Sequence, residues 1–403
     1  MDVPLSEGLN ADGVAAVQRA SDQLATLESR YSPYTGGSGY LDSHTGTRGF
    51  DRLQRFEADL ESSSVFGDSV RFTVATHPVL LESGIPDASS NYHFGSTSRS
   101  AGTPARLTTA TTGNPLPTVD QFAAGYGGEL QIASRLVQGS VGYSPYNFPV
   151  AHALGSLAAQ LGSLPVSLRA YREPVMDTLL SYAGIKDLNS GVIWGGVVAT
   201  GGSLRLASGT GLSGFYASID GQELTGRNVS SNTKIDGGAG AYFQVFRDQN
   251  GALKVGVNLT AMHYDHNERY FTFGQGGYFS PASFLLMNAP ITWEGATSNN
   301  VSYLLNGSLG IQSFQDSAAQ AGSLIAGTGV QSVTGASYDF HARVAYHLNQ
   351  HWIVEGFVDA NNARDYNNAA GGFGVRYVMR PLPLNGGPTG LADERVVRTL
   401  EIP

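Results

Sequence analysis

The chain has 403 residues, a formal net charge of −9 and no cysteine, which excludes a disulfide framework and a thiolate site. Only 14% of its residues are charged, against about 25% in soluble proteins, yet hydrophobic residues reach just 41%. The acidic balance argues against nucleic acid as a partner. Few charges together with 52 Gly, 19 Tyr and 18 Phe are typical of a membrane barrel, in which alternate residues face lipid and aromatic residues gather at both interfaces.

Helical insertion into a membrane is excluded by the length of the apolar runs. The longest, such as residues 284–287, fall far short of the roughly 18 consecutive apolar residues of a membrane helix. Residues 1–4 show no basic segment followed by an apolar core. We therefore expect no signal peptide here, and we interpret the chain either as processed or as a piece of a longer precursor.

One helix is predicted near the start of the chain, over residues 11–30. Asp12 is a suitable cap, apolar residues follow at helical spacing, and Pro33 ends the pattern. We interpret residues 1–33 as a periplasmic linker helix that precedes the barrel. A packing helix of a soluble domain is the alternative.

From Tyr34 onward the hydrophobic period changes to two, which predicts strands. The clearest strand spans residues 335–348, where Tyr338 and Val344 share one face and Asp339 and Arg343 share the other. A sheet face that carries such charges must be hydrated. Several strands reach the roughly 9–11 residues of a membrane strand, which favours a barrel over a soluble β-sandwich with shorter strands.

The fold class predicted is all-β, a transmembrane antiparallel barrel of about sixteen strands over residues 34–380, with a short N-terminal helix. A C-terminal tail follows at 381–403, either periplasmic or within the lumen. The expected strands span 34–45, 49–61, 67–80, 121–134, 136–143, 151–161, 165–172, 192–207, 211–219, 235–247, 252–264, 282–293, 300–314, 335–348, 352–361 and 370–380.

The connections between these strands alternate between short turns and long loops. The long ones are expected at 81–120, 173–191, 220–234, 265–281 and 315–334. With both termini in the periplasm, nearly every long loop falls outside the cell, as in outer-membrane barrels. The first connection, near Gly46, is the exception, being external and short.

Alternation also predicts which side chains line the channel, because the polar face of each strand must turn inward. The expected lining residues are Arg55, Glu57, Asp59, Arg71, Thr73, Asn258, Thr260, Tyr264, Asp339, His341, Arg343, Glu355, Asp359 and Arg376.

The residues offer little support for catalysis. Carboxylates such as Glu57 and Asp59 resemble a glycosidase pair only in type, and pore lining explains them without further assumption. His263, His266 and Glu268 gather where a loop begins, and we interpret them as a polar loop rather than a metal site. We expect no enzyme activity, no cofactor and no metal, with an outer-membrane enzyme as the less favoured alternative.

Several loop segments resemble a known family. They read PVMDTLLSYAG at 174–184, WGGV at 194–197, GRNV at 226–229, and FGQGGYFSP at 273–281. In this order and spacing they are similar to the C-terminal domain of cellulose synthase operon protein C, the outer-membrane cellulose exporter. The resemblance covers most of residues 34–380, while the long loop at 85–119 and the tail after Arg380 depart from it.

The resemblance implies a passive export channel for cellulose or a related glucan in the bacterial outer membrane. Its implied partners are lipid and lipopolysaccharide, periplasmic tetratricopeptide repeats of the full-length protein, and an inner-membrane cellulose synthase complex. The motif segments are expected on external loops, where a gate belongs, either as a lid or with Tyr278 and Phe279 stacking on sugar. The expected gate residues are Asp177, Ser181, Tyr182, Trp194, Asn228, Gly274, Gly276, Gly277, Tyr278, Phe279 and Pro281.

Two other kinds of outer-membrane channel remain as alternatives, a general diffusion porin and an exporter of another polysaccharide. An exporter of an anionic polymer should have a basic lumen. The polar faces here mix both signs of charge, which favours a neutral glucan.

Overall fold

The computed structural model describes most of the chain. The linker helix expected within residues 1–31, most of the loop at 85–119 and nearly all of the tail lie outside the described residues. The described ranges are 32–67, 69–86, 94–95, 120–161, 164–187, 190–209, 212–248, 251–298, 300–318, 330–362 and 366–381.

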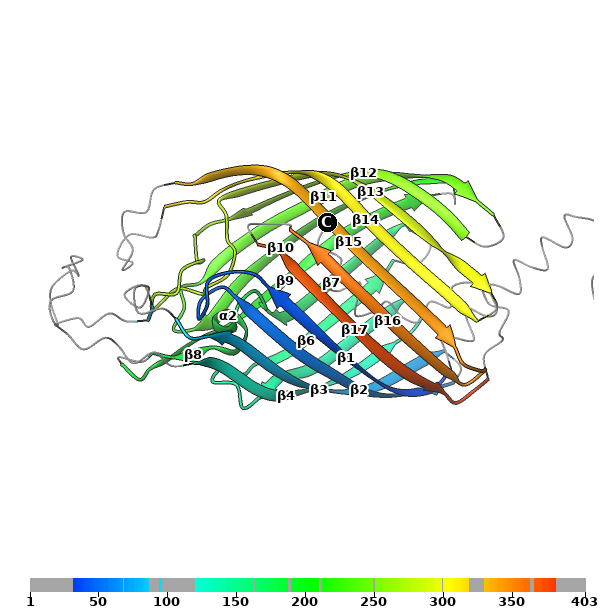
Figure 1. Cartoon of the computed structure of the whole chain (residues 1–403), viewed down its shortest axis with the longest axis horizontal. Coiled ribbons are helices and arrows are strands. Elements are labelled where there is room, and N and C mark those ends of the chain that lie inside the picture. Colours follow the sequence, from blue (N-terminus) through cyan, green and yellow to red (C-terminus); the bar gives the residue numbers. More distant parts are fainter. Residues whose placement is uncertain are drawn as a thin grey trace, which may run out of the picture.

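The strands form one closed antiparallel barrel. Each strand pairs with its neighbours in chain order, and the first pairs with the last, Tyr34 opposite Val378. The sixteen wall strands are β1 (Tyr34–His44), β2 (Leu53–Phe66), β3 (Val70–Gly84), β4 (Gln121–Ala133), β5 (Val137–Tyr146), β6 (Ala153–Gln160), β7 (Val166–Pro174), β9 (Ile193–Gly209), β10 (Ser213–Arg227), β11 (Asn232–Arg247), β12 (Gly251–Tyr264), β13 (Ser283–Ser298), β14 (Val301–Gln315), β15 (Ser332–His347), β16 (Trp352–Asn361) and β17 (Asn368–Val378). All sixteen expected strands are confirmed, and Figure 1 shows them inclined to the barrel axis.

The two faces of the wall differ as the alternation predicts. Outward apolar side chains are exposed, with Leu309 at 73% and Phe373 at 68%, whereas inward polar side chains such as His341 and Asn258 are buried. Aromatic pairs lie on the outer surface toward both ends, for example Trp352 against Tyr377. A closed wall with an apolar outside is the fold of a membrane-spanning barrel, so the sandwich alternative is excluded.

The short turns gather at one end of the barrel and most longer connections at the other, as expected. The loop predicted at 220–234 is wrong: β10 and β11 pair as far as Leu224 and Asn232, so only residues 228–231 connect them. The polar residues Asp220 and Gln222 lie within β10 rather than in a loop. Their polarity marks an inward face, since Tyr171 on β7 donates to Asp220.

Two elements at the long-loop end were not predicted. They are the helix α2 (Leu179–Ala183) and the two-residue strand β8 (Ile185–Lys186), which pairs with the start of β9. Figure 1 places both at the left end of the barrel. Among the described residues, no helix has the length and apolar character needed to cross a membrane.

Candidate functional site

Helix α2 is short and entirely buried. Thr178 caps it: the Thr178 side chain accepts from the Ser181 backbone N–H, and the Ser181 hydroxyl accepts from the Thr178 backbone N–H. All five helical residues are buried, and Gly184 ends the helix with φ +71°. A helix of this length has little stability of its own, so packing inside the barrel mouth holds it.

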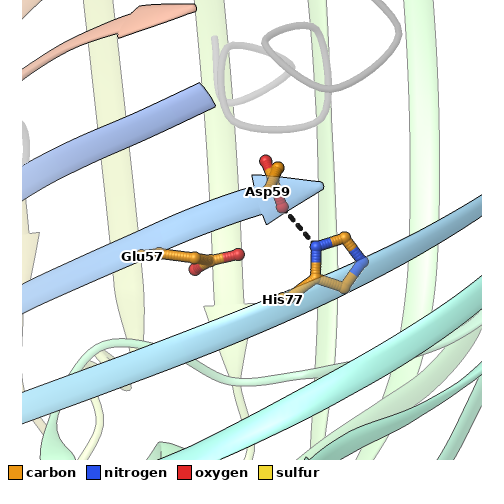
Figure 2. A group of neighbouring side chains, drawn as sticks. All are labelled: Glu57, Asp59 and His77. Atoms are coloured by element: carbon orange, nitrogen blue, oxygen red, sulfur yellow. Dashed lines mark hydrogen bonds and ion pairs between the residues drawn. The ribbon is translucent and has the colours of Figure 1, made fainter. Parts of the chain in front are cut away.

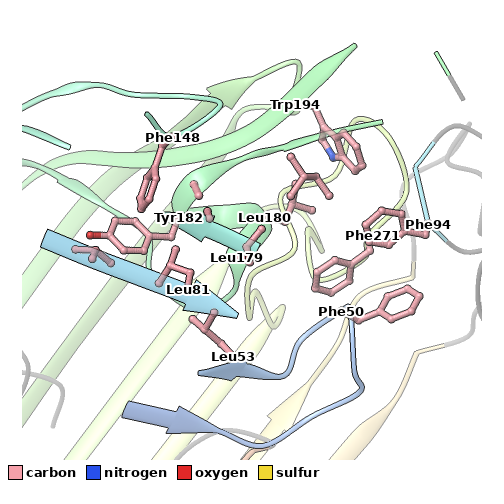
Figure 3. Packing of buried hydrophobic residues seen from close by; sticks show 14 residues of the cluster. Phe50, Leu53, Leu81, Phe94, Phe148, Leu179, Leu180, Tyr182, Trp194 and Phe271 are labelled. Atoms are coloured by element: carbon pink, nitrogen blue, oxygen red, sulfur yellow. The ribbon is translucent and has the colours of Figure 1, made fainter. Parts of the chain in front are cut away.

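An apolar cluster surrounds α2 and joins segments that lie far apart in the sequence. Phe50 lies edge-on to both Phe94 and Phe271, each at 5.4 Å between ring centroids. Phe148 packs in the same way on Tyr182 of α2, at 5.2 Å. Figure 3 shows these rings grouped around α2. Edge-to-face aromatic pairs add about 0.5–1.5 kcal/mol each beyond their buried area, so this cluster fixes the loops against the wall.

A second loop, residues 265–282, is folded around the buried side chain of Glu268. The Gly276 backbone N–H donates to Glu268 Oε2 at 3.0 Å, and the Gly277 N–H donates to the Glu268 carbonyl oxygen at 2.7 Å. The Glu268 backbone N–H in turn donates to Ser280 Oγ at 2.7 Å. Burial raises the pKa of Glu268 to about 8, against the smaller opposing effect of the Gly276 hydrogen bond. This carboxyl is therefore largely protonated at neutral pH.

The two loops are tied to each other by buried polar contacts. The Thr178 hydroxyl donates to the Gly277 carbonyl oxygen at 2.8 Å, and the Phe279 backbone N–H donates to Asp177 Oδ2 at 3.1 Å. Asn232 Nδ2 donates to Tyr278 Oη at 3.2 Å. Residues 174–187 and 265–282, which we call the plug, thus form one connected unit at the long-loop end.

Two aromatic residues of the glycine-rich segment, Tyr278 and Phe279, are inside the plug rather than at its surface. Tyr278 is 1% exposed, and Phe279 packs on Phe314 at 5.3 Å between centroids. Gly277 has φ +68°, and a side chain there would press on Leu180 of α2. In this conformation the rings of Tyr278 and Phe279 are covered by protein and offer no face to a sugar.

The other expected gate residues divide between buried and exposed positions. Trp194 is fully buried beside β8, and Pro281 accepts from the Tyr264 backbone N–H at 3.1 Å. Asn228 is exposed in the β10–β11 turn with φ +52°, where its side chain donates to the Ile193 carbonyl oxygen at 2.9 Å. Gly274, with φ +99°, accepts from the Ser230 backbone N–H at 2.9 Å.

The expected lining residues lie on the inward face, and many are paired across strands. Arg55 pairs with Asp42, Arg343 with Glu355, and Arg376 with Glu61, at 2.8, 2.6 and 3.2 Å. These pairs follow the wall from β15 through β17 and β1 to β2. Each of these three pairs joins an arginine to a carboxylate, so both signs of charge are interspersed along this part of the wall.

The remaining expected lining residues are placed as follows. Two of them form ion pairs with histidines, Asp59 with His77 and Asp359 with His341. Three contact tyrosines: Glu57 accepts from Tyr40, Asn258 accepts from Tyr216, and Arg71 lies over the Tyr34 ring. Thr73 and Thr260 are buried, and Asp339 is half-buried. Tyr264 differs from the rest, because it is buried against Tyr278 and belongs with the plug packing.

Two residues of the plug were missed by the sequence analysis. Thr178 lies inside a recognised motif, and its spacing to Ser181 is that of a capping box, a signal that was present. Glu268 was interpreted as part of a polar loop, whereas it is fully buried. Nothing local distinguishes it, since its burial depends on the fold of the loop around it.

Comparison with known proteins is consistent with this geometry. The family model described as cellulose synthase operon protein C C-terminus matches residues 51–380. Cellulose synthase operon protein C of Xanthomonas axonopodis pv. citri is 32% identical over 71% of this chain and 21% of its own length. The Pseudomonas fluorescens protein of the same name is 29% identical over 86% of this chain and 27% of its own length.

Among solved structures, a bacterial polysaccharide outer membrane secretin has the same fold. Its TM-score is 0.52 at 8% sequence identity, covering 86% of this chain and 98% of that chain. The chain spans about a quarter of the length of the two relatives described above.

Proposed function

Since the chain belongs to the cellulose synthase operon protein C C-terminus family, we propose that it is the outer-membrane channel through which cellulose leaves the cell. The observation that carries the proposal is the combination of a hydrated, charge-balanced lumen with a folded plug at the end where the long loops lie. In this proposal the transport step is passive, because a synthase in the inner membrane extends the cellulose polymer and thereby pushes it through the channel. Catalysis forms no part of the proposal.

The lumen suits a neutral polymer. Cross-strand pairs such as Arg343 with Glu355 satisfy the charges within the wall and leave both signs interspersed. An anionic polysaccharide needs a basic path, and a wall with paired charges gives it none. A glucan carries hydroxyl groups that exchange hydrogen bonds with such a wall without needing a counter-ion. The lining role of the expected residues other than Tyr264 is part of this proposal.

The plug is proposed as the gate. It contains two of the family-typical segments, residues 174–184 and 273–281, and in this proposal it closes the exit. Phe279 packs on Phe284 of β13 and Phe314 of β14, and Tyr278 packs on Tyr264. Because its members are tied by hydrogen bonds rather than by covalent links, the plug can open as a unit when a polymer arrives from the periplasmic side.

The direct test deletes residues 34–380 from the full-length protein in a cellulose-producing bacterium. We expect polymer to accumulate in the periplasm while synthesis continues and secretion stops. Unchanged secretion would contradict the proposal.

Liposome swelling separates a gated exporter from a general diffusion porin. The refolded chain is expected to admit small sugars slowly, because the plug closes the resting channel. Free entry of small sugars at porin-like rates would favour the porin. Reconstitution with the synthase and the periplasmic repeat domain then tests those two proposed partners.

A further inference from the structure

Two carboxylates and one imidazole converge on the inner wall near the plug. Asp59 on β2 lies opposite His77 on β3, in the register that pairs Glu57 with Val79. Glu57 and Asp59 are two residues apart and share the inward face of β2. One ligand atom from each of Glu57, Asp59 and His77 lies within 4.8 Å of the others. Figure 2 shows the three side chains turned toward one another.

Side chains outside the cluster contact two of its members, Glu57 and His77. Tyr40 Oη donates to Glu57 Oε2 at 2.6 Å. Glu129 Oε2 on β4 lies 4.0 Å from His77 Nε2, and Gln131 Nε2 donates to the same Glu129 oxygen at 2.7 Å. Glu129 therefore lies at ion-pair distance from His77 Nε2, on the side where a metal-bound imidazole usually meets a carboxylate. The arrangement therefore orients His77 Nδ1 toward the carboxylates of β2.

The charge balance of the cluster favours a bound cation. Glu57, Asp59 and Glu129 bring three carboxylates close together, and like charges at such distances oppose one another. Arg55 on the same strand pairs with Asp42 at 2.8 Å and also contacts Met176 of the plug. A divalent cation would lower the repulsion among the three carboxylates.

We propose that Glu57, Asp59 and His77 form a binding site for a divalent transition-metal cation, with Zn²⁺ as the probe. An imidazole with carboxylates suits Zn²⁺ and its first-row neighbours, whereas Mg²⁺ and Ca²⁺ prefer oxygen ligands alone. The cation takes the place of the ion pair between His77 and Asp59. Glu129 acts as the positioning residue for His77. The site is independent of what the channel exports.

The test is a calorimetric titration of the refolded full chain, in detergent, with Zn²⁺. We expect one saturable site that Mg²⁺ does not fill. His77→Ala should weaken Zn²⁺ binding at least tenfold, and Glu129→Gln, which acts through His77, about 10–100-fold. The matched control is His341→Ala: His341 forms the same kind of cross-strand pair with Asp359. Among the described residues, only the Glu57 group converges as a ligand set, so the control should bind Zn²⁺ normally.

A second measurement, with other variants, keeps the proposal testable if His77→Ala folds poorly. Co²⁺ bound by an imidazole and carboxylates absorbs visible light, and Asp59→Asn should abolish that spectrum while Leu309→Ala, on the outer surface, should keep it. The proposal is overturned if Zn²⁺ does not saturate, or if His341→Ala weakens binding as much as His77→Ala does. It is equally overturned if folded His77→Ala and Asp59→Asn both bind normally, which would leave an ion pair only.

Discussion

The Thr178 hydroxyl donates a hydrogen bond to the carbonyl oxygen of Gly277, 99 residues further along the chain. Thr178 is also the cap of α2, so one side chain both begins the helix and fastens the glycine-rich segment to it. Asp177 adds a parallel contact by accepting from the Phe279 backbone N–H at 3.1 Å. The packing of the two loops of the plug on each other therefore depends on a few polar groups that lie in separate parts of the sequence.

Replacing Thr178 with Val should loosen the plug. Valine keeps the shape of threonine but leaves the Gly277 carbonyl oxygen without this donor and removes the helix cap, at a cost of about 1–3 kcal/mol. Because about 1.4 kcal/mol is a factor of ten in an equilibrium, the open fraction should rise at least several-fold. Entry of small sugars into liposomes measures it. Thr178→Ser keeps the hydroxyl and should behave like the parent chain; equal swelling rates for all three proteins would contradict the role of this contact.

Glu268 makes the plug sensitive to pH. Its pKa in the folded loop is about 8, above the ordinary value of 4.5. At a pH between these two pKa values, the unfolded loop has released the Glu268 proton while the folded loop still holds it. The stability of the folded loop therefore falls as pH rises, by up to about 1.4 kcal/mol per pH unit. Above pH 8 the stability that the protonated carboxyl contributes is fully lost. Channel conductance in planar bilayers should therefore increase from pH 5 to pH 8.

The matched variant for this prediction is Glu268→Gln. Glutamine keeps an oxygen that accepts from the Gly276 backbone N–H, yet it has no proton to lose in this range. Its conductance should be low and nearly independent of pH. A variant that retains the full pH response would show that another group is responsible.

The outer and inner faces of β14 provide a test of the membrane-facing surface. Leu309 is 73% exposed on the outside near the middle of the strand, whereas Asn306 lies on the inward face. Leu309→Arg should lower the free energy of unfolding in lipid by about 2–4 kcal/mol, because arginine must enter hydrocarbon. Asn306→Arg should cost much less, since water reaches that face. Urea titration in vesicles measures both, and a larger loss for Asn306→Arg would reverse the assignment of the two faces.

The wall of the barrel was predictable because each strand obeys a local rule. Leu309 faces outward and Asn306 inward by alternation alone, and the same rule located all sixteen strands. The rule failed at 220–234, where polar inward residues such as Asp220 look like a loop when the strand is taken without its partner. Pairing with β11 and the hydrogen bond from Tyr171 keep that segment extended.

The plug was less predictable because its order comes from contacts across the barrel mouth. Helix α2 has only five residues and lacks a strong periodic signal, and it exists because Tyr182 and its neighbours are buried among rings from other loops. Glu268 is buried for the same reason. The family-typical segments indicated where a gate should lie. They did not indicate whether Tyr278 and Phe279 are open to a sugar or buried against other side chains of the protein.

These 403 residues contain no cysteine, which allows a direct test of the central claim, that the polymer passes through the lumen. Single cysteines replace Asn306, on the inward face, and Leu309, on the outward face, in the full-length protein of a cellulose-producing strain, with any cysteine outside these residues changed to serine, and a bulky thiol reagent is added. Cellulose released into the medium is then measured. The account predicts that modification at position 306 stops release while the same modification at 309 leaves it unchanged. Undiminished release after complete labelling at 306 would contradict it.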